Sequence, residues 1–370
     1  MKKTVLVLAI AALPMTAFAQ SEVTLYGKLN LAANAAKMFG NNPDMKTTAR
    51  IDDNGSRFGI RGTEALGNGL NAIFQIESWL SGDGTTLNGG SRANQLGGRD
   101  TFLGLQGGWG KVRLGRLSTY QNSDMETMTP WSGQLVLGID SIGIMTRFDG
   151  RLNNAIRYDS PNLAGLDLML IYSTDEERIG NKNRFVWGVG AGYTRNNFFV
   201  KTGYTQYQKQ NGNSDKDGNY WRIEGGYDST LSIIGAYQES TQYGASATGG
   251  TNSIWMRPTG NYSSGVLGAS TVAFGGNDKM KTQEAAITAS YQLGSLTPRA
   301  SFVWGADAKV NGKKLSDSGY KQFIIGADYV LSKRTTAYAA FGYICYDSDK
   351  YTDGRHDNES MLSIGLTHSF

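Results

Sequence analysis

Apolar and polar residues alternate along most of this chain. Near its start, every second residue from Val23 to Leu31 is apolar or glycine, and the residues between them are mostly polar. The same period of two recurs around residues 57–61, 185–193 and 322–329. Because successive side chains of a β-strand point to opposite faces, this period predicts strands. No segment shows a 3.6-residue apolar stripe of helical length, so we predict an all-β protein.

The last ten residues, MLSIGLTHSF, still alternate when the chain ends at Phe370. Leu362, Ile364 and Leu366 share one face with this terminal aromatic residue. A strand that runs to its final residue needs a neighbour, because an unpaired terminal strand frays and exposes backbone hydrogen-bonding groups. We therefore predict that the last strand pairs with the first, near Val23 to Asn30, and closes an antiparallel β-barrel.

Two kinds of connection separate the predicted strands, and they alternate. Short turns such as EALGNG, GGWG and QLGS alternate with long hydrophilic loops. Short turns at the periplasmic rim and long loops at the outer rim are typical of outer-membrane barrels, whereas a soluble sandwich has no reason to sort its loops in this way. The long loops fall around residues 38–51, 82–98, 119–150, 209–219, 305–319 and 347–359.

Residues 1–19 have the features of a secretory signal peptide. The dipeptide Lys2-Lys3 precedes an apolar run, and Ala17-Phe18-Ala19 provides a small-x-small cleavage site. The apolar run is well short of the ~20 residues that a membrane-spanning helix needs. We therefore expect residues 1–19 to be removed. Because no linker or composition shift follows, we expect residues 20–370 to form one barrel domain outside the cytoplasm.

The composition agrees with a barrel. The chain has 49 Gly, 19 Tyr and 14 Phe against only 6 Pro, a β-rich balance with no collagen-like or disordered signature. The mean hydropathy of −0.36 resembles that of a soluble protein, but a barrel strand is apolar only at alternate positions. The net charge is +4, or +2 without Lys2-Lys3, so we expect no nucleic-acid partner. Cys345 is the only cysteine, so no disulfide within the chain is expected.

Six stretches, spread in order over the mature chain, carry a specific likeness. They are VTLYGKL (23–29), SRFGIRGTEALGNGLNAIFQIES (56–78), GKVRLGRL (110–117), IRYDSPNLAGL (156–166), LSKRTTAYAAFGY (331–343) and GLTHSF (365–370). Together they resemble the general diffusion porins of Gram-negative bacteria, and most of all the β-proteobacterial type that includes the neisserial porins. The chain is accordingly expected in the outer membrane.

The resemblance implies a 16-stranded barrel, a homotrimer and a water-filled channel for passive passage of ions and small hydrophilic solutes. It implies that the third long loop folds into the pore and narrows it. It also implies recognition of Phe370 by the barrel assembly machinery. We expect outer-membrane lipids around the barrel, and no cofactor or metal. Our count of alternating segments gives eighteen, with an extra pair in residues 253–274. Pro258 weakens that pair as strands, so we expect sixteen.

The face rule places five cationic side chains inside the barrel. Each alternates with residues of the apolar face, and a charge facing lipid near the midplane would cost about 2–4 kcal/mol. These residues are Lys28, Arg57, Arg61, Arg113 and Arg157. We predict that they form the wall of the pore constriction. The alternative is that they solvate the wall or pair with carboxylates that hold the loop in place.

Residues 119–150 form the longest loop of the first half and correspond to the constriction loop that the resemblance implies. They contain Asp124, Glu126, Asp140 and Asp149, and an apolar stretch, GQLVLGIDSIGIM, that is able to pack against the barrel interior. An acidic loop opposite a basic wall produces a transverse field across the narrowest point, and such a field orients solutes and sets ion preference. The basic wall predicts weak anion preference.

Two other classes of function compete with a diffusion channel. A barrel hydrolase needs a histidine base beside a nucleophile, but His356 lies in a charged loop and His368 on the lipid side of the last strand, so we expect no enzyme. A substrate-specific or structural, adhesive barrel would use its long loops. Conduction of small ions without saturation distinguishes a general pore from such a barrel.

Overall fold

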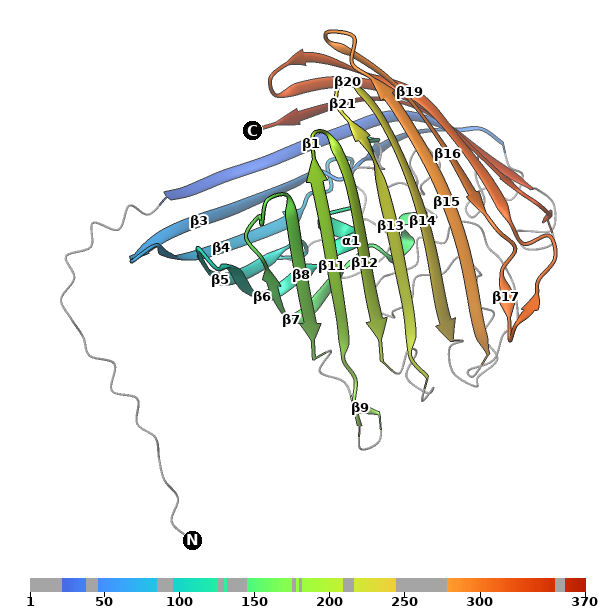
Figure 1. Ribbon diagram of the computed structural model, residues 1–370. Helices are drawn as coiled ribbons and strands as arrows, with labels where there is room; N and C mark the ends of the chain where they lie inside the picture. The colour runs from blue at the N-terminus through green and yellow to red at the C-terminus, as the bar shows by residue number, and fades with distance from the viewer. Residues whose placement is uncertain are drawn as a thin grey trace.

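In the computed structural model, the protein forms a closed ring of β-strands (Figure 1). The structure describes residues 22–37, 46–84, 96–125, 130–131, 145–174, 178–179, 182–208, 216–243, 278–349 and 357–370. Sixteen of the described strands make up the ring, each antiparallel to its neighbours. They are β1 (Glu22–Lys37), β3 (Arg57–Gly67), β4 (Leu70–Trp79), β5 (Thr101–Gly107), β6 (Gly110–Ser118), β7 (Arg151–Asp159), β8 (Leu166–Ser173), β11 (Val186–Arg195), β12 (Phe198–Tyr207), β13 (Gly218–Asp228), β14 (Leu231–Tyr243), β15 (Lys279–Tyr291), β16 (Leu296–Gly305), β19 (Tyr320–Ser332), β20 (Thr335–Tyr346) and β21 (Asn358–Ser369).

Shorter elements lie outside the ring sequence. β2 (Thr48–Asp53) extends the pairing of β1, β17 (Lys309–Val310) pairs with β15 and β18 (Lys313–Lys314), and β9 (Arg178–Ile179) pairs with β10 (Lys182–Asn183). A helical turn, α1 (Tyr120–Ser123), and a 3₁₀ turn (Met145–Phe148) belong to the connection between β6 and β7.

The last strand closes the ring against the first, as the terminal alternation predicts. β21 pairs with β1 from Ser369 opposite Lys28 to Ser360 opposite Lys37. Beyond the strand, Phe370 and Gly27 exchange backbone hydrogen bonds of 3.0 and 3.1 Å. The Phe370 ring covers Gly27, where an added Cβ would lie 2.2 Å from a ring carbon. The final residue is therefore held by the first strand.

The number of strands in the ring is also decided by direct pairing. β14 pairs with β15 along thirteen residue pairs, from Leu231 opposite Tyr291 to Tyr243 opposite Lys279. The ring therefore leaves no place for two further strands between them, and the prediction of sixteen is confirmed. Residues 253–274, the source of the eighteen-strand count, lie outside the described residues.

Short and long connections alternate around the ring as predicted. Two-residue turns join β3 to β4 and β11 to β12, whereas β6 and β7 are separated by residues 119–150. Asn68-Gly69 and Asn196-Asn197 occupy the two short turns with positive φ at every position. Asparagine and glycine tolerate this conformation, and such turns match the twist of a hairpin.

The outer face is apolar and carries aromatic side chains near both strand ends. Leu25, Ile325 and Ile364 are each more than 60% exposed, which suits contact with lipid. Near the short turns, the exposed aromatic residues are Trp109, Tyr193, Phe198, Tyr291, Tyr329 and Phe370. Along β19, Phe323 and Tyr329 are six residues apart, which is about 20 Å at the usual strand rise. This arrangement resembles the two aromatic girdles of a membrane barrel.

Apolar side chains also form a core inside the ring. Val303, Ile324 and Ile344 are almost fully buried on the inner faces of β16, β19 and β20, in one cluster with Trp131 and Met145 of the long connection. If this part of the wall faced a water-filled lumen, these side chains would be exposed. The inner face is therefore partly covered by the connection between β6 and β7.

A candidate pore constriction

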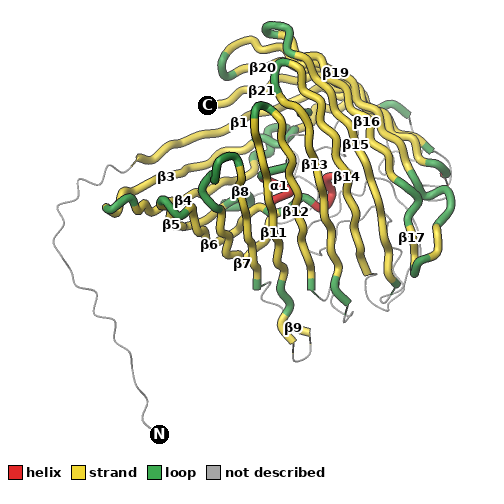
Figure 2. Tube along the Cα trace, in the orientation of Figure 1, coloured by secondary structure: helices red, strands yellow, loops and turns green. Residues whose placement is uncertain are grey.

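The connection between β6 and β7 begins by docking against the inside of the barrel. Figure 2 shows α1 inside the ring of strands, beside β11 and β12. The ring of Tyr120 lies over Gly190, where an added Cβ would be 2.0 Å from a ring carbon. Gln121 lies against Gly203 in the same way, at 2.8 Å. The glycines of these strands leave the space that the loop occupies.

A hydrogen bond fixes the far end of the Tyr120 ring. Its hydroxyl donates to Asp167 over 2.7 Å. Burial, together with this hydrogen bond, raises the pKa of the Tyr120 hydroxyl, which stays protonated at all physiological pH values. The uncharged side chain of Tyr120 therefore packs this part of the loop against the wall.

A fully buried arginine of the wall clasps both arms of the loop. One Nη of Arg222 on β13 donates to the Gln121 carbonyl oxygen over 2.9 Å and forms an ion pair of 2.7 Å with Asp149. On β14, Gln238 donates to the carbonyl oxygen of Met145 over 2.7 Å. The outgoing and the returning arm of the loop are thus attached to adjacent strands.

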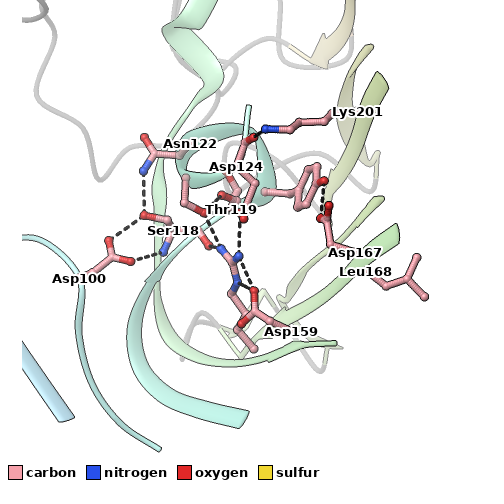
Figure 3. Close-up of polar contacts among 12 residues, drawn as sticks. Asp100, Ser118, Thr119, Asn122, Asp124, Asp159, Asp167, Leu168 and Lys201 are labelled. Carbon is pink, nitrogen blue, oxygen red and sulfur yellow. Dashed lines mark hydrogen bonds and ion pairs between the residues drawn. The ribbon is translucent and has the colours of Figure 1, made fainter. Parts of the chain in front are cut away.

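A second arginine binds the start of the loop close to β6 and β7, the strands that the loop connects. Arg157 on β7 forms ion pairs of 2.7 Å with Asp124 and 2.6 Å with Asp159, and it donates to the Ser118 carbonyl oxygen. From β12, Lys201 donates to the backbone oxygen of Asp124 over 2.6 Å (Figure 3). Asp124 is therefore held by cations from two strands, β7 and β12.

The inner face of β3 to β6 differs, because cations border a recess of about 410 Å³. Five of its lining residues are cationic and two are acidic. These are Arg57, Arg99, Lys111, Arg113 and Arg151, with Glu77 and Asp100. Among the described residues, Arg57 and Lys111 form no ion pair, whereas Arg113 pairs with Asp159 over 2.6 Å. The recess therefore keeps positive charge that is not neutralised by contact.

The segment before β5 supplies paired charges at one side of this recess. Ser118 donates to Asp100 from its hydroxyl over 2.7 Å and from its backbone N–H over 3.2 Å (Figure 3). Burial raises the pKa of Asp100, but the Arg151 guanidinium and the Ser118 hydrogen bonds outweigh it, and the net pKa lies below the usual value. Burial and repulsion from Arg151 lower the pKa of Arg99 to about 10, so Arg99 remains charged at neutral pH.

The residues predicted for the basic wall separate into two groups. Lys28 and Arg57 are directly opposite each other on β1 and β3, and Arg61 stands 5.1 Å from the ring of Tyr26. Arg113 and Arg157 are also neighbours, on β6 and β7, but both are buried and paired with carboxylates. Of the predicted loop acids, Asp124 and Asp149 are ion-paired with the wall. Glu126 and Asp140 lie outside the described residues.

Lys111, Arg222 and Arg299 are site residues that the sequence reasoning missed. The face rule was able to find all three, because Lys111 is two residues from Arg113, Arg222 lies between Trp221 and Ile223, and Arg299 lies between two outward residues. The sequence also indicates the surface on which the loop docks. Gly188, Gly190 and Gly192 are the inward positions of β11, and a strand face of glycines leaves room for another segment.

Other kinds of site are weakly supported. Within the described ranges, no cluster of His, Cys, Asp and Glu is arranged to hold a metal ion, and no helix is long and apolar enough to cross a membrane. His368 faces outward next to Thr335, at 2.9 Å between ring Nδ1 and hydroxyl, and His356 lies outside the described residues. The described histidine is therefore remote from the barrel interior.

Comparison with known proteins decides the family. The family model for the Gram-negative porin matches residues 4–350. The chain belongs to the Gram-negative porin family. Relatives of this porin include the major outer membrane protein P.IB of Neisseria sicca, 32% identical over 383 aligned residues, and that of Neisseria meningitidis serogroup A, 30% identical. Both alignments cover the whole of each chain.

Solved structures support the same fold for this porin. The anion-selective porin from Comamonas acidovorans superposes with a TM-score of 0.70 at 21% identity, over 95% of this chain and 100% of the other. The trimer form of OmpT from Vibrio cholerae gives 0.62 at 14% identity, over 95% and 99%. The predicted family, closed barrel and outer-membrane location are therefore confirmed.

Proposed function

We propose that this porin is a general diffusion channel, not an enzyme, that prefers small anions weakly. The observation that carries the proposal is the charge of the recess beside β3 to β6. Two of its cationic lining residues, Arg57 and Lys111, form no ion pair among the described residues. In a narrow, low-dielectric channel such an excess of positive charge attracts anions and repels cations. Because water and ions must also leave the site, binding has to remain weak.

The two groups of arginines have different roles in this proposal. Arg57, Arg61 and Lys111 supply the field, since they form no ion pair among the described residues. Arg113 and Arg157 are neutralised by Asp159 and Asp124, so they hold the wall and the start of the loop. This division combines the two alternatives that the sequence left open. Lys28 contributes to the basic side of the wall through its place opposite Arg57.

We further propose that the porin assembles as a homotrimer. The support is the family and the trimer form reported for OmpT of Vibrio cholerae. Electrophoresis of unheated protein and openings in groups of three in a planar bilayer test this assembly. A single-step channel from a monomer-sized species would contradict it.

Replacing Arg57 tests the anion preference. In a planar bilayer under a salt gradient, wild-type porin should give ohmic openings and an anion-favouring reversal potential. Arg57→Ala should shift that potential toward cations, because an unpaired positive charge is removed from the recess. Lys333→Ala removes the same charge at a short turn and is the matched control.

Three outcomes would contradict this proposal. An unchanged reversal potential in Arg57→Ala would remove Arg57 from the selectivity wall. Saturable block of the wild-type current by one solute would instead favour a substrate-specific barrel, and absence of any conductance would favour a structural or adhesive one.

A further inference from the structure

The middle of the 119–150 loop is attached to the wall opposite its origin. Counted along the ring, β16 is the eighth strand after β6, half-way around sixteen strands. Pro130 and Trp131 lie there, against the inner faces of β16 and β19. The loop is therefore held at positions about half a turn of the barrel apart.

Trp131 is inserted into a fitted socket. It is 2% exposed, and its indole N–H donates to the hydroxyl of Ser301 on β16 over 2.9 Å. That hydroxyl is 2.7 Å from the hydroxyl of Thr288 on β15. On β19, an added Cβ at Gly326 would come within 3.0 Å of the indole ring. A buried tryptophan with a satisfied N–H is a strong packing group.

Arg299 completes the attachment through three different contacts. Its guanidinium donates to the carbonyl oxygen of Pro130, forms an ion pair with Asp328 on β19, and lies 5.3 Å from the centre of the Trp131 ring. Arg299 is buried in this arrangement. A rigid, planar guanidinium is well suited to bind a carbonyl, a carboxylate and an aromatic face at once.

We propose that Trp131 and Arg299 form a far anchor that fixes the position of the constriction loop and thereby the width of the pore. The attachments at Arg222 and Arg157 hold the two ends of the loop, and among the described residues Trp131 and Arg299 hold the part between them. Without the far anchor, the middle of the loop samples several positions, since local segments with few attachments open readily. The anchor is a positioning device and does not select ions, because Arg299 is neutralised by Asp328.

Single-channel recording of loop-anchor variants tests this proposal, which rests on the channel function. Trp131→Ala should replace one uniform conductance level by several levels with greater open-channel noise. The reversal potential should not change, because no charge is removed. Arg299→Lys should show the same loss of uniform level, since it keeps the charge but not the planar group. Trp131→Phe, which retains an aromatic ring in the socket, should restore most of the uniform level.

The control lies on the same strand. Trp304 faces outward on β16 and is 43% exposed, so Trp304→Ala removes an equal side chain without touching the loop. It should keep the wild-type level. Wild-type level and noise in both Trp131→Ala and Arg299→Lys would overturn the far anchor.

Limited proteolysis separates this proposal from the channel function. In folded, detergent-solubilised protein, Trp131→Ala should increase cleavage within residues 119–150 relative to wild type and Trp304→Ala. Equal cleavage would count against the anchor even if the protein conducts. Conversely, increased cleavage in a protein that does not conduct would support the anchor while refuting the channel.

Discussion

Two parts of the inner wall carry inward-facing arginines and use them in opposite ways. On β3, Arg57 borders an open recess and forms no ion pair among the described residues. On β13, Arg222 is fully buried under the loop and paired with Asp149. The strand pattern is the same in both places. What differs is whether another segment covers the side chain, and that decides whether a charge acts on solutes or fastens the structure.

The wall that the loop covers also differs in the space that its side chains leave for the loop. Gly190 and Gly203 replace side chains where Tyr120 and Gln121 dock, and Tyr120 belongs to an apolar cluster with Met125 and Phe148. The recess side offers long polar side chains in the corresponding positions. The wall at β11 and β12 is thus shaped to hold the loop, whereas the wall at β3 to β6 borders the recess.

The largest expected effect comes from breaking the buried pair. Arg222→Gln leaves the Asp149 carboxylate without its cation, and loss of one partner of a buried ion pair typically costs about 3–5 kcal/mol. The urea midpoint of unfolding should fall strongly. Arg57→Gln, on the open wall, should change stability by less than about 0.5 kcal/mol.

The double variant Arg222→Gln with Asp149→Asn sharpens this test. It removes both charges, so part of the lost stability should return. Equal urea midpoints for Arg222→Gln and Arg57→Gln would show that the two walls do not differ as described.

A medium effect is expected from filling the space under the loop. Gly190→Ala places a methyl group 2.0 Å from the Tyr120 ring, and such overpacking typically costs about 1–3 kcal/mol. Gly235→Ala is the matched control, because its Cβ would find only one atom within 4 Å, at 3.9 Å. Unfolding midpoints compare the two variants.

Coupling to Tyr120 identifies the cause. Adding Tyr120→Ala to Gly190→Ala should remove the extra cost, because the clashing ring is gone. Additive losses from the two substitutions would instead place the strain elsewhere in β11.

The smallest effect is a pH dependence at the border between the two walls. Because the folded pKa of Asp100 is lowered, its contribution to stability is complete above the usual carboxyl range and is lost as pH falls through the folded pKa. Urea midpoints measured from neutral pH down to about pH 3 should therefore fall less steeply in Asp100→Asn than in wild type. Parallel curves for the two proteins would show that Asp100 has no part in acid sensitivity.

Much of the barrel follows from local alternation. The period of two predicted the strands, their outward faces, the alternating connections and the closure of Phe370 onto the first strand. Lipid demands an apolar face and a partner for every backbone group, so each strand records its own orientation in its sequence. Alternation alone did not give the number of strands, since residues 253–274 alternate too. The direct pairing of β14 with β15 is what shows that these two strands are neighbours in a ring of sixteen.

The roles of the inward charges were not determined by the same rule. Alternation placed Arg57 and Arg157 on one face and could not distinguish them, because it carries no information about what lies across the lumen. The tertiary structure brings Asp124 onto Arg157, Asp149 onto Arg222 and Trp131 onto Arg299, over sequence separations of 33, 73 and 168 residues. Strand orientation is a property of adjacent residues and is fixed by the sequence itself. Pairing across the pore depends on where the loop docks, and only the closed barrel defines that surface.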